Sequence, residues 1–238
     1  MIKGRGLMAN VLRKIDDDKY LFYVNGISNS VIHEIPENNF EYDEIMQLAE
    51  DIEDRIFVYV STTQVNVQEN HSRPYVRHKF KMECLVKDSF SNYLVVRTSN
   101  LVGNNPWNTH TLFNFLYNAL MAGREISVVE SAMRNILDAD HFTDLFDYYL
   151  KNEYHKNHII NIINPVTFNM AEILKAFEVV FNKSFLKNHV EDSIAYFDAP
   201  AGLSLLLLEN CDINLDNYLS TVIKKYYVSV INTFNLQT

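Results

Sequence analysis

Short apolar runs that suit β-strands alternate with amphipathic helical segments along most of this chain. Strands are predicted where β-branched and aromatic residues run together, and helices where apolar residues recur every three or four positions. The predicted strands span residues 20–25, 55–61, 93–100 and 157–164. The predicted helices span residues 41–54, 75–87, 108–123 and 170–181, with Gly123 as a C-cap and Asn169 as an N-cap. This alternation is typical of βαβ units, so we expect an α/β fold with a largely parallel sheet.

The composition is that of a globular protein and disfavours several classes of partner. The chain has 238 residues, 47% of them hydrophobic, which is enough for a sizeable core. Its formal net charge is −9, from 30 acidic and 21 basic residues, which disfavours a nucleic-acid surface. No apolar run is long enough to span a bilayer, and Cys84 and Cys211 form no CxxC pair. We therefore expect a cytoplasmic protein that binds neither nucleic acid nor membrane.

A glycine-rich turn lies in the first stretch, MIKGRGLMANVLRKI. Gly4, Gly6 and Ala9 form a G-x-G-x-x-A pattern, and helical spacing begins near Leu7. Glycines in such a turn let the backbone approach a pyrophosphate, which the N-terminus of the helix then attracts. An ordinary turn is the competing interpretation of so short a pattern. We take Gly4, Gly6, Leu7 and Met8 as candidate dinucleotide contacts.

The segment VYVSTTQVNVQENHSRPYVRHK, residues 58–79, places a tyrosine four positions before a lysine, after a strand that ends in hydroxyl side chains. Tyr75 and Lys79 share one face of the predicted helix. A free tyrosine has a pKa of about 10, and the charge of Lys79 is expected to favour the phenolate. Such a pair, with a nearby hydroxyl, can pass a proton to or from a carbinol while a nicotinamide exchanges a hydride. The competing interpretation of this spacing alone is an exposed tyrosine and a solvated lysine.

Taken together, several segments resemble the extended short-chain dehydrogenase/reductases, in particular the nucleotide-sugar epimerases, dehydratases and reductases. FVYVSTTQV is similar to the strand-end S-[ST]-x-x-V segment of that family, and PYVRHKFKMECLV to its P-Y-x-x-x-K-x-x-x-E helix. VVRTSNLVGNNPW resembles its R-x-x-N-x-x-G-P stretch with altered spacing before Pro106, and GREISVVESAMRNILDADHF resembles its arginine-bearing segment. The resemblance covers roughly residues 1–175. It implies a Rossmann-like, mostly parallel sheet with helices on both faces and a small C-terminal α/β substrate lobe.

The resemblance also implies roles for individual residues. Tyr75 corresponds to the acid/base, Lys79 to its partner, and Thr62 to the catalytic hydroxyl, with Thr63 as the fallback. The implied cofactor is NAD or NADP, and its predicted contacts are Gly4, Gly6, Leu7, Met8, Asn25, Gly26, Ser61 and Lys79. The implied substrate is a nucleotide-diphosphate sugar, and its predicted contacts are Thr63, Asn100 and Arg134. Competing interpretations are a strand-end cap for Asn100 and a surface charge for Arg134, and Asp140 is expected to be structural.

The activity implied by the family is that of an NAD(P)-dependent oxidoreductase, a 4-ketosugar reductase or an epimerase. Dehydration is disfavoured, because the family's dehydratases carry an Asp-Glu pair where this chain has Thr63 and Gln64, which cannot act as carboxylate acids or bases. The family also implies a homodimer that pairs residues 40–54 and 75–87 across a two-fold axis, and a place in surface-polysaccharide synthesis.

One departure from the family concerns length. About 70 residues separate the glycine turn from Tyr75, and the segment YLFYVNGISNS resembles the family's fourth strand although it follows the first helix directly. The second and third strands are therefore expected to be missing, together with the residue that reads the adenosine ribose. We expect a reduced dinucleotide-binding part at residues 1–104. The remaining strands and the substrate-binding lobe are expected at residues 105–238.

Two other functions are compatible with the sequence. A degenerate relative that binds a sugar nucleotide or a partner without catalysis would account for the missing adenosine half. A metal-dependent hydrolase is suggested by eight histidines, with His155 and His158 three positions apart. These two lack a third clustered ligand, so a solvated loop is favoured and no metal site is expected.

Overall fold

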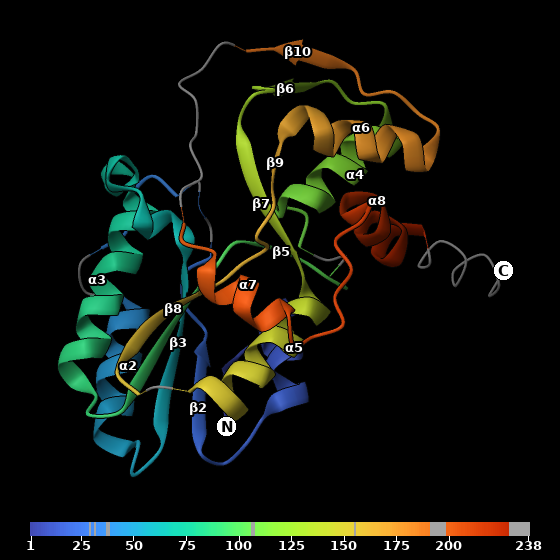
Figure 1. Ribbon diagram of the computed structural model, residues 1–238. Helices are drawn as coiled ribbons and strands as arrows, with labels where there is room; N and C mark the ends of the chain where they lie inside the picture. The colour runs from blue at the N-terminus through green and yellow to red at the C-terminus, as the bar shows by residue number, and fades with distance from the viewer. Residues whose placement is uncertain are drawn as a thin grey trace, which may run out of the picture.

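The computed structural model describes residues 1–28, 30, 32–36, 39–105, 108–154, 156–190 and 199–228. Its main sheet has five parallel strands in the spatial order β1-β2-β3-β4-β8. These strands are β1 (Ile2–Gly4), β2 (Tyr20–Val24), β3 (Ile56–Thr62), β4 (Tyr93–Thr98) and β8 (His158–Ile162). The α/β fold with a mostly parallel sheet, predicted from the sequence, is confirmed (Figure 1).

Helices cover both faces of this sheet (Figure 1). One face packs against α2 (Phe40–Asp51) and α3 (Pro74–Ser89). The opposite face packs against α1 (Gly6–Leu12), α5 (Ala139–Tyr148) and α7 (Gly202–Leu208). The result is a three-layer arrangement in which both sides of each central strand are buried.

Burial on both faces explains the continuous apolar runs in the sequence. Along β3, Phe57 and Tyr59 belong to the core beneath α2 and α3, whereas Ile56 and Val58 belong to the core of the opposite layer. Successive side chains of a strand point to opposite faces, so a strand between two helical layers must be apolar at every position. The Phe57 ring also stacks on Phe90, just after α3, with ring centroids 3.9 Å apart.

The connections between the first four strands differ in hand. These strands lie side by side in chain order, so each connection steps the same way across the sheet. α1 packs on one face, whereas α2 and α3 pack on the other. The β1–α1–β2 connection therefore has the opposite hand to the two that follow, although about 98% of such connections in proteins are right-handed. Within the described part of the chain no strand lies beyond β1, so the sheet ends there.

A second lobe lies beyond the carboxyl ends of the main strands (Figure 1). Its strands are β5 (Asn100–Val102), β6 (Ile126–Val128), β7 (Met133–Asp138), β9 (Thr167–Asn169) and β10 (Lys187–His189). They form a β5-β7-β9 sheet, antiparallel between β7 and β9, and a parallel β6-β10 pair. Its helices are α4 (Leu112–Ala122), α6 (Met170–Phe181) and α8 (Tyr218–Ile223), which share an aromatic core that includes Phe113 and Phe177. Because β8 returns to the main sheet after β7, the two parts interleave along the chain.

Helix ends follow the capping signals in the sequence. Asn169 accepts a hydrogen bond from the Glu172 backbone and closes a capping box at α6, and Gly123 ends α4 with a φ of 60°. Both predicted caps are thus confirmed. The helix predicted at 108–123 begins later, at Leu112, because Asn108 forms a turn in which its side chain accepts from the His110 backbone at 3.3 Å. Short 3₁₀ and π segments complete the chain: η1 (Arg13–Ile15), η2 (Thr63–Asn66), η3 (Gln68–Ser72), η4 (Tyr149–Glu153) and η5 (Lys224–Val228).

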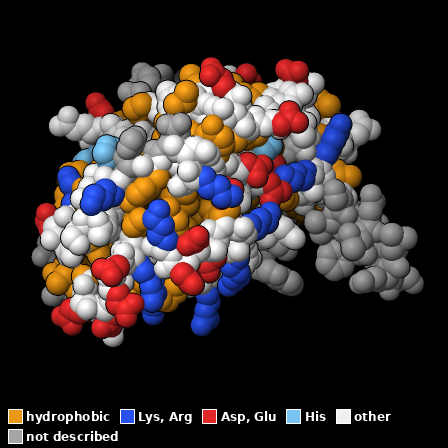
Figure 2. Space-filling view, turned by 60° about the horizontal axis from the view of Figure 1, so that its bottom comes forward, with side chains coloured by type: hydrophobic (Ala, Val, Ile, Leu, Met, Phe, Trp, Pro, Cys, Tyr) orange, Lys and Arg blue, Asp and Glu red, His pale blue; other side chains and the backbone are white. Residues whose placement is uncertain are grey.

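The surface carries both signs of charge. Figure 2 shows a face on which acidic and basic side chains are interspersed around patches of hydrophobic side chains. Among the described helices, none combines the length and the apolar character needed to cross a bilayer.

Candidate active site

Three of the predicted residues lie at the end of β3 and in the first two turns of α3. Thr62 is the last residue of β3, Tyr75 lies in the first turn of α3, and Lys79 lies one turn further on. The Tyr75 and Thr62 side chains are hydrogen-bonded to each other. Thr62 and Lys79 are buried and Tyr75 is half-buried. The spacing in the sequence therefore brings Tyr75 to Thr62 at the carboxyl edge of the sheet, with Lys79 one turn further along α3.

Lys79 is held by a buried acid that the sequence analysis did not single out. Glu41 of α2 is completely buried, and its Oε1 accepts from the Lys79 Nζ at 3.1 Å and from the Tyr59 hydroxyl at 2.7 Å. Lys79 Nζ also donates to the Tyr59 hydroxyl at 3.0 Å. Glu41 Oε2 accepts from the Ile27 backbone N–H at 2.7 Å and lies 2.8 Å from His78 Nε2. Each carboxylate oxygen therefore has two partners.

These partners determine the charge of Glu41. Burial alone would raise the pKa of this carboxyl, but the charge of Lys79 and the hydrogen bonds from His78, Tyr59 and Ile27 lower its pKa to about 2. An ionised carboxylate can only accept hydrogen bonds, so His78 must carry its proton on Nε2. Glu41 and Lys79 form a buried ion pair, and such pairs are strongly destabilised when one partner is removed.

The pKa of Tyr75 shifts in the direction opposite to that expected. Burial raises it, the charge of Glu41 raises it further, and the hydrogen bond with Thr62 lowers it, so that the pKa of Tyr75 reaches about 12. The expectation that Lys79 would favour the phenolate is wrong for the protein in this state. The physical reason is that the Lys79 ammonium is paired with Glu41, whose negative charge also faces the phenol.

The glycine turn combines close backbone packing at Gly4 with open space at Gly6. Gly4 has a φ of +136°, and a Cβ there would lie 2.6 Å from the Val24 carbonyl carbon, so only glycine fits between β1 and β2. Gly6 has a φ of +85°, and a Cβ there would meet no atom within 4 Å, so space is open above it. Ala9 is fully buried where α1 meets the sheet. Of the other predicted contacts, Leu7 packs near Gly103 and Met8 is half-buried.

The remaining predicted cofactor contacts surround Lys79. A Cβ at Gly26 would lie 2.6 Å from Lys79 Nζ and closer still to Glu41 Oε1, so only glycine lets the backbone after β2 pass beside this buried ion pair. Ser61 Oγ is buried and has no hydrogen-bond partner within the described residues. Asn25 is exposed, and its amide donates to Glu44 at 2.8 Å.

This site fits one half of a nicotinamide dinucleotide. The open space at Gly6, the Ser61 hydroxyl without a partner among the described residues, and the buried Lys79 ammonium suit the pyrophosphate and nicotinamide–ribose part. In doubly wound folds the adenosine part lies over strands on the far side of the first strand. Here the described sheet ends at β1, so nothing corresponds to that half.

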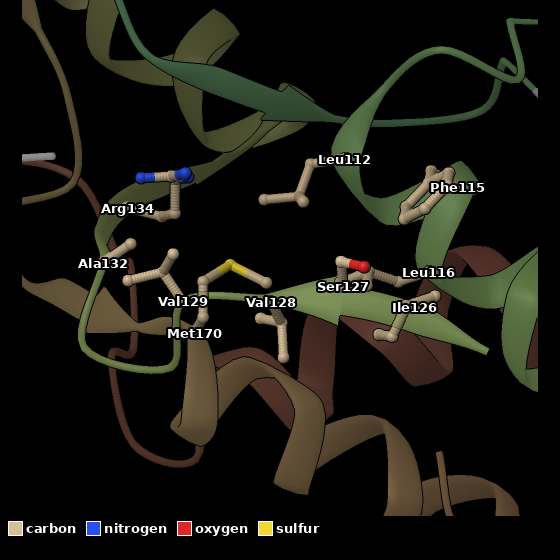
Figure 3. A pocket seen from close by; sticks show the side chains of 10 residues that line it. All are labelled: Leu112, Phe115, Leu116, Ile126, Ser127, Val128, Val129, Ala132, Arg134 and Met170. Atoms are coloured by element: carbon tan, nitrogen blue, oxygen red, sulfur yellow. The ribbon is translucent and has the colours of Figure 1, made fainter. Parts of the chain in front are cut away.

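Arg134 lies in a cavity of about 260 Å³ in the second lobe. Figure 3 shows Arg134 at one end of this cavity and Phe115 at the other, with Met170 between them. Arg134 Nη1 donates to the Met133 carbonyl at 2.8 Å, and no carboxylate among the described residues pairs with this guanidinium. Burial lowers the pKa of Arg134, and the nearby charge of Arg73 lowers it further. A half-buried cation that faces apolar walls and a second cation is suited to an anionic ligand.

The other predicted substrate contacts lie differently. Thr63 is 2% exposed at the start of η2. Asn100 is exposed, and its amide donates to the Asn135 carbonyl at 3.0 Å, which ties β5 to β7. The side chain of Asn100 thus takes part in joining two strands of the lobe, in agreement with the competing interpretation as a cap.

Two further positions of the family-like motifs form an ion pair. Arg97 of β4 donates to Glu83 of α3, with 2.9 Å between Nε and Oε1, and Arg97 Nη1 donates to Asn66 at 2.6 Å. Glu83 is 1% exposed. This pair fixes α3, which carries Tyr75 and Lys79, against the sheet.

No metal centre is found among the described residues, since none of their His, Cys, Asp and Glu side chains form a group of three that could hold an ion. Of the two histidines considered above, His155 lies outside the described residues, and His158 is exposed with its Nδ1 2.9 Å from the Lys156 carbonyl.

Sequence reasoning missed Glu41, Tyr59 and His78, although a signal was present. Glu41, Ile45 and Leu48 follow helical spacing and are all buried, so the acid continues the apolar stripe of α2. His78 lies on the buried side of α3 in the same way. A charged residue within an apolar stripe indicates a buried partner, because an isolated buried charge is costly.

The parallel sheet covered by helices on both faces, with a glycine turn after β1, defines a Rossmann-like α/β fold. No protein-family model and no curated protein matches the chain in sequence. UDP-glucuronic acid 4-epimerase from Bacillus cereus, solved with UDP-glucuronic acid and NAD, is similar with a TM-score of 0.67 and 17% identity, over 93% of this chain and 79% of that one. RMD from Pseudomonas aeruginosa, complexed with NADPH, has a TM-score of 0.68 and 12% identity, over 87% and 80% of the two chains.

A dTDP-glucose 4,6-dehydratase from Bacillus anthracis, in complex with NAD, is similar as well, with a TM-score of 0.65 and 13% identity, over 92% of this chain and 75% of that one. The fold that the sequence resemblance implied, that of the nucleotide-sugar epimerases and dehydratases, is therefore confirmed. This chain is shorter than each of these proteins, as expected for a reduced sheet.

Proposed function

We propose that this protein is an NAD(P)-dependent oxidoreductase that acts on a sugar linked to a nucleotide diphosphate, as a 4-ketosugar reductase or an epimerase. The observation that carries the proposal is the Thr62–Tyr75 hydrogen bond at the end of β3, with Lys79 one turn away. The fold shared with nucleotide-sugar epimerases and dehydratases supports it. Thr63 and Gln64, which follow Thr62, disfavour a dehydratase because neither is a carboxylic acid.

In this proposal each residue has a defined task. Thr62 holds the substrate oxygen against Tyr75, and Tyr75 exchanges a proton with that oxygen. Two N–H groups of Lys79 are engaged by Glu41 and Tyr59, which leaves the third for the nicotinamide ribose. Gly4, Gly6, Leu7, Met8, Asn25, Gly26 and Ser61 would line the rest of that site. A nicotinamide dinucleotide bound there would supply or accept the hydride.

The substrate would lie between this group and the second lobe. Arg134 would pair with the diphosphate, and the apolar walls of its cavity would contact the base. Thr63 and Asn100 are proposed to contact the sugar. The cavity alone is too small for a whole sugar nucleotide, which must therefore extend toward Tyr75.

We further propose a cytoplasmic homodimer that pairs α2 and α3 of two copies. Phe40, Met46 and Phe80 on the outer sides of these helices are 55%, 38% and 42% exposed. A four-helix arrangement would cover them. Replacing Phe80 by Glu should convert the dimer to a monomer in sedimentation analysis, and an unchanged sedimentation coefficient would contradict this arrangement.

The decisive test is Tyr75→Phe. We expect hydride transfer with a keto-sugar nucleotide to fall by roughly 100-fold or more, with ligand binding retained, because the phenol supplies the proton. Tyr42→Phe, on α2, is the matched control and should retain activity. Undiminished activity of Tyr75→Phe would refute the proposed chemistry.

A second candidate function is favoured because no described strand lies beyond β1. A protein without the adenosine side could bind a sugar nucleotide without catalysis. Calorimetry with NAD, NADH, NADP and NADPH, each with and without UDP, GDP, CDP or dTDP, separates the two. Micromolar binding of a dinucleotide supports the enzyme, whereas binding of a nucleoside diphosphate alone supports the binding protein.

A further inference from the structure

Glu41 lies at the centre of the candidate site. It is not hydrogen-bonded to Tyr75, the predicted acid/base. Its carboxylate contacts groups from three elements: Lys79 and His78 of α3, Tyr59 of β3 and the Ile27 backbone after β2. All three side chains are buried. A carboxylate with two partners on each oxygen is fixed in position, and it fixes its partners in turn.

The pairing with Glu41 changes what Lys79 can do. A lysine one turn after a tyrosine favours the phenolate only while its positive charge is not cancelled. Here the ammonium lies 3.1 Å from Glu41 Oε1, and the two side chains are 5% and 0% exposed. Tyr75 faces the charge of Glu41 from α2 and the Tyr59 phenol from β3, and the Thr62 hydroxyl is bonded to it. His78 and Lys79 follow Tyr75 on its own helix.

We propose that Glu41 is a positioning residue that neutralises Lys79 and keeps the Tyr75 phenol protonated, so that the site gives a proton to a substrate carbonyl oxygen rather than taking one from a carbinol. This inference rests on the proposed function and narrows it to ketone reduction. When hydride adds to the carbonyl carbon, the electron pair of the C=O π bond moves to oxygen, and that oxygen takes the phenolic proton. The tyrosinate then recovers a proton from water.

The populations support this direction. Burial and the charge of Glu41 raise the pKa of Tyr75 above that of an ordinary tyrosine, so the phenol stays protonated at pH 7. An epimerase that begins by oxidising a carbinol requires the ionised form as its base. A reductase requires the protonated form, which is nearly the whole population.

The test is a titration of Tyr75 in the protein without any ligand. Protein labelled with ¹³C in the tyrosine rings is titrated by NMR, and the Tyr75 signal is assigned by its absence from Tyr75→Phe. In the unmodified protein we expect the signal to stay that of the phenol throughout the pH range in which the chain is folded. In Glu41→Gln the Tyr75 pKa should fall by at least about one unit, because the Lys79 charge is no longer paired.

Glu44→Gln is the matched control, since Glu44 lies one turn along α2 and bonds Tyr23 and Asn25 but not Lys79. It should leave the Tyr75 signal unchanged. A folded Glu41→Gln whose Tyr75 titrates as in the unmodified protein would overturn the inference.

If Glu41→Gln does not fold, the double variant Glu41→Gln/Lys79→Met decides, because it removes both buried charges. A Tyr75 pKa that is unchanged or lower supports the inference. A rise of about one unit or more contradicts it, because Lys79 would then have acted on Tyr75 despite Glu41. The titration contains no dinucleotide and no sugar, so its result does not depend on whether Tyr75→Phe abolishes turnover. Failure of the inference can therefore be told apart from failure of the proposed function.

Discussion

The buried Glu41 carboxylate should make the stability of this fold sensitive to acid in a way that one substitution removes. In the folded protein its pKa lies at about 2, below its ordinary value of 4.5. A carboxyl whose pKa is lowered by folding stabilises the native state above its unfolded pKa, and this contribution is lost as the pH falls toward the folded pKa. The relevant window therefore runs from about pH 5 down to about pH 2.

The size of this stabilisation follows from the shift of the Glu41 pKa. A difference of roughly 2.5 units corresponds to roughly 3 kcal/mol of unfolding free energy at neutral pH, of which about 1.4 kcal/mol should be lost by pH 3.5. Glu41→Gln removes this contribution and leaves the Lys79 ammonium buried without its partner. We expect the variant to be less stable at pH 7 by about 3–5 kcal/mol.

Urea unfolding of the unmodified protein and of Glu41→Gln at pH 7, 5.5, 4.5 and 3.5 measures the gap between their free energies of unfolding. The gap should be constant from pH 7 to 5.5 and narrow by about 1.4 kcal/mol at pH 3.5. Glu50→Gln, an exposed position on α2, should change the stability by no more than about 0.5 kcal/mol at any pH. A gap that stays the same down to pH 3.5 would show that the partners of Glu41 do not hold it ionised.

Two further predictions concern the glycine turn and the arginine cavity. Gly4→Ala should prevent stable folding or lower the free energy of unfolding by more than about 2 kcal/mol, because its φ is +136° and the new Cβ meets backbone at 2.6 Å. The new Cβ of Gly6→Ala meets no atom within 4 Å, so this variant should lose about 1 kcal/mol in urea unfolding. Equal losses would contradict this interpretation of the turn. Arg134→Gln should weaken UDP binding in calorimetry by about tenfold or more, while the exposed Lys175→Gln leaves it unchanged. Equal affinities for both variants would remove Arg134 from the ligand site.

Much of the fold could be predicted because its elements depend on local pattern. The four predicted strands match β2, β3, β4 and β8 within one or two residues, since a strand buried on both faces must be continuously apolar. The helix at 170–181 matches α6 because a capping box defines its start. The hand of the β1–α1–β2 connection could not be predicted, because it depends on which face α1 packs against and not on any local pattern.

The candidate site was predictable in part for the same reason. Tyr75 and Lys79 are one turn apart on a helix, so their proximity is local, and the end of β3 brings Thr62 to them. Glu41 is 38 residues from Lys79 in sequence, and only the packing of α2 against α3 joins them. A non-local charge therefore reversed the expected shift of the Tyr75 pKa, which spacing alone could not reveal.

The unusual hand of the first connection bears on how a dinucleotide would bind. If the strand after α1 were on the far side of β1, a right-handed connection would place α1 on the face where it lies here. The chain crosses instead to β2, as expected if the strands beyond β1 are missing and α1 has kept its place. The adenosine half of a dinucleotide would then contact little of the described protein.

On the proposed function, reduced nicotinamide mononucleotide should bind with an affinity within about tenfold of that of the dinucleotide, a difference below about 1.4 kcal/mol. Calorimetry with both compounds measures this ratio. A dinucleotide bound about 100-fold more tightly would instead mean that another surface, such as a second copy at the free edge of β1, holds the adenosine.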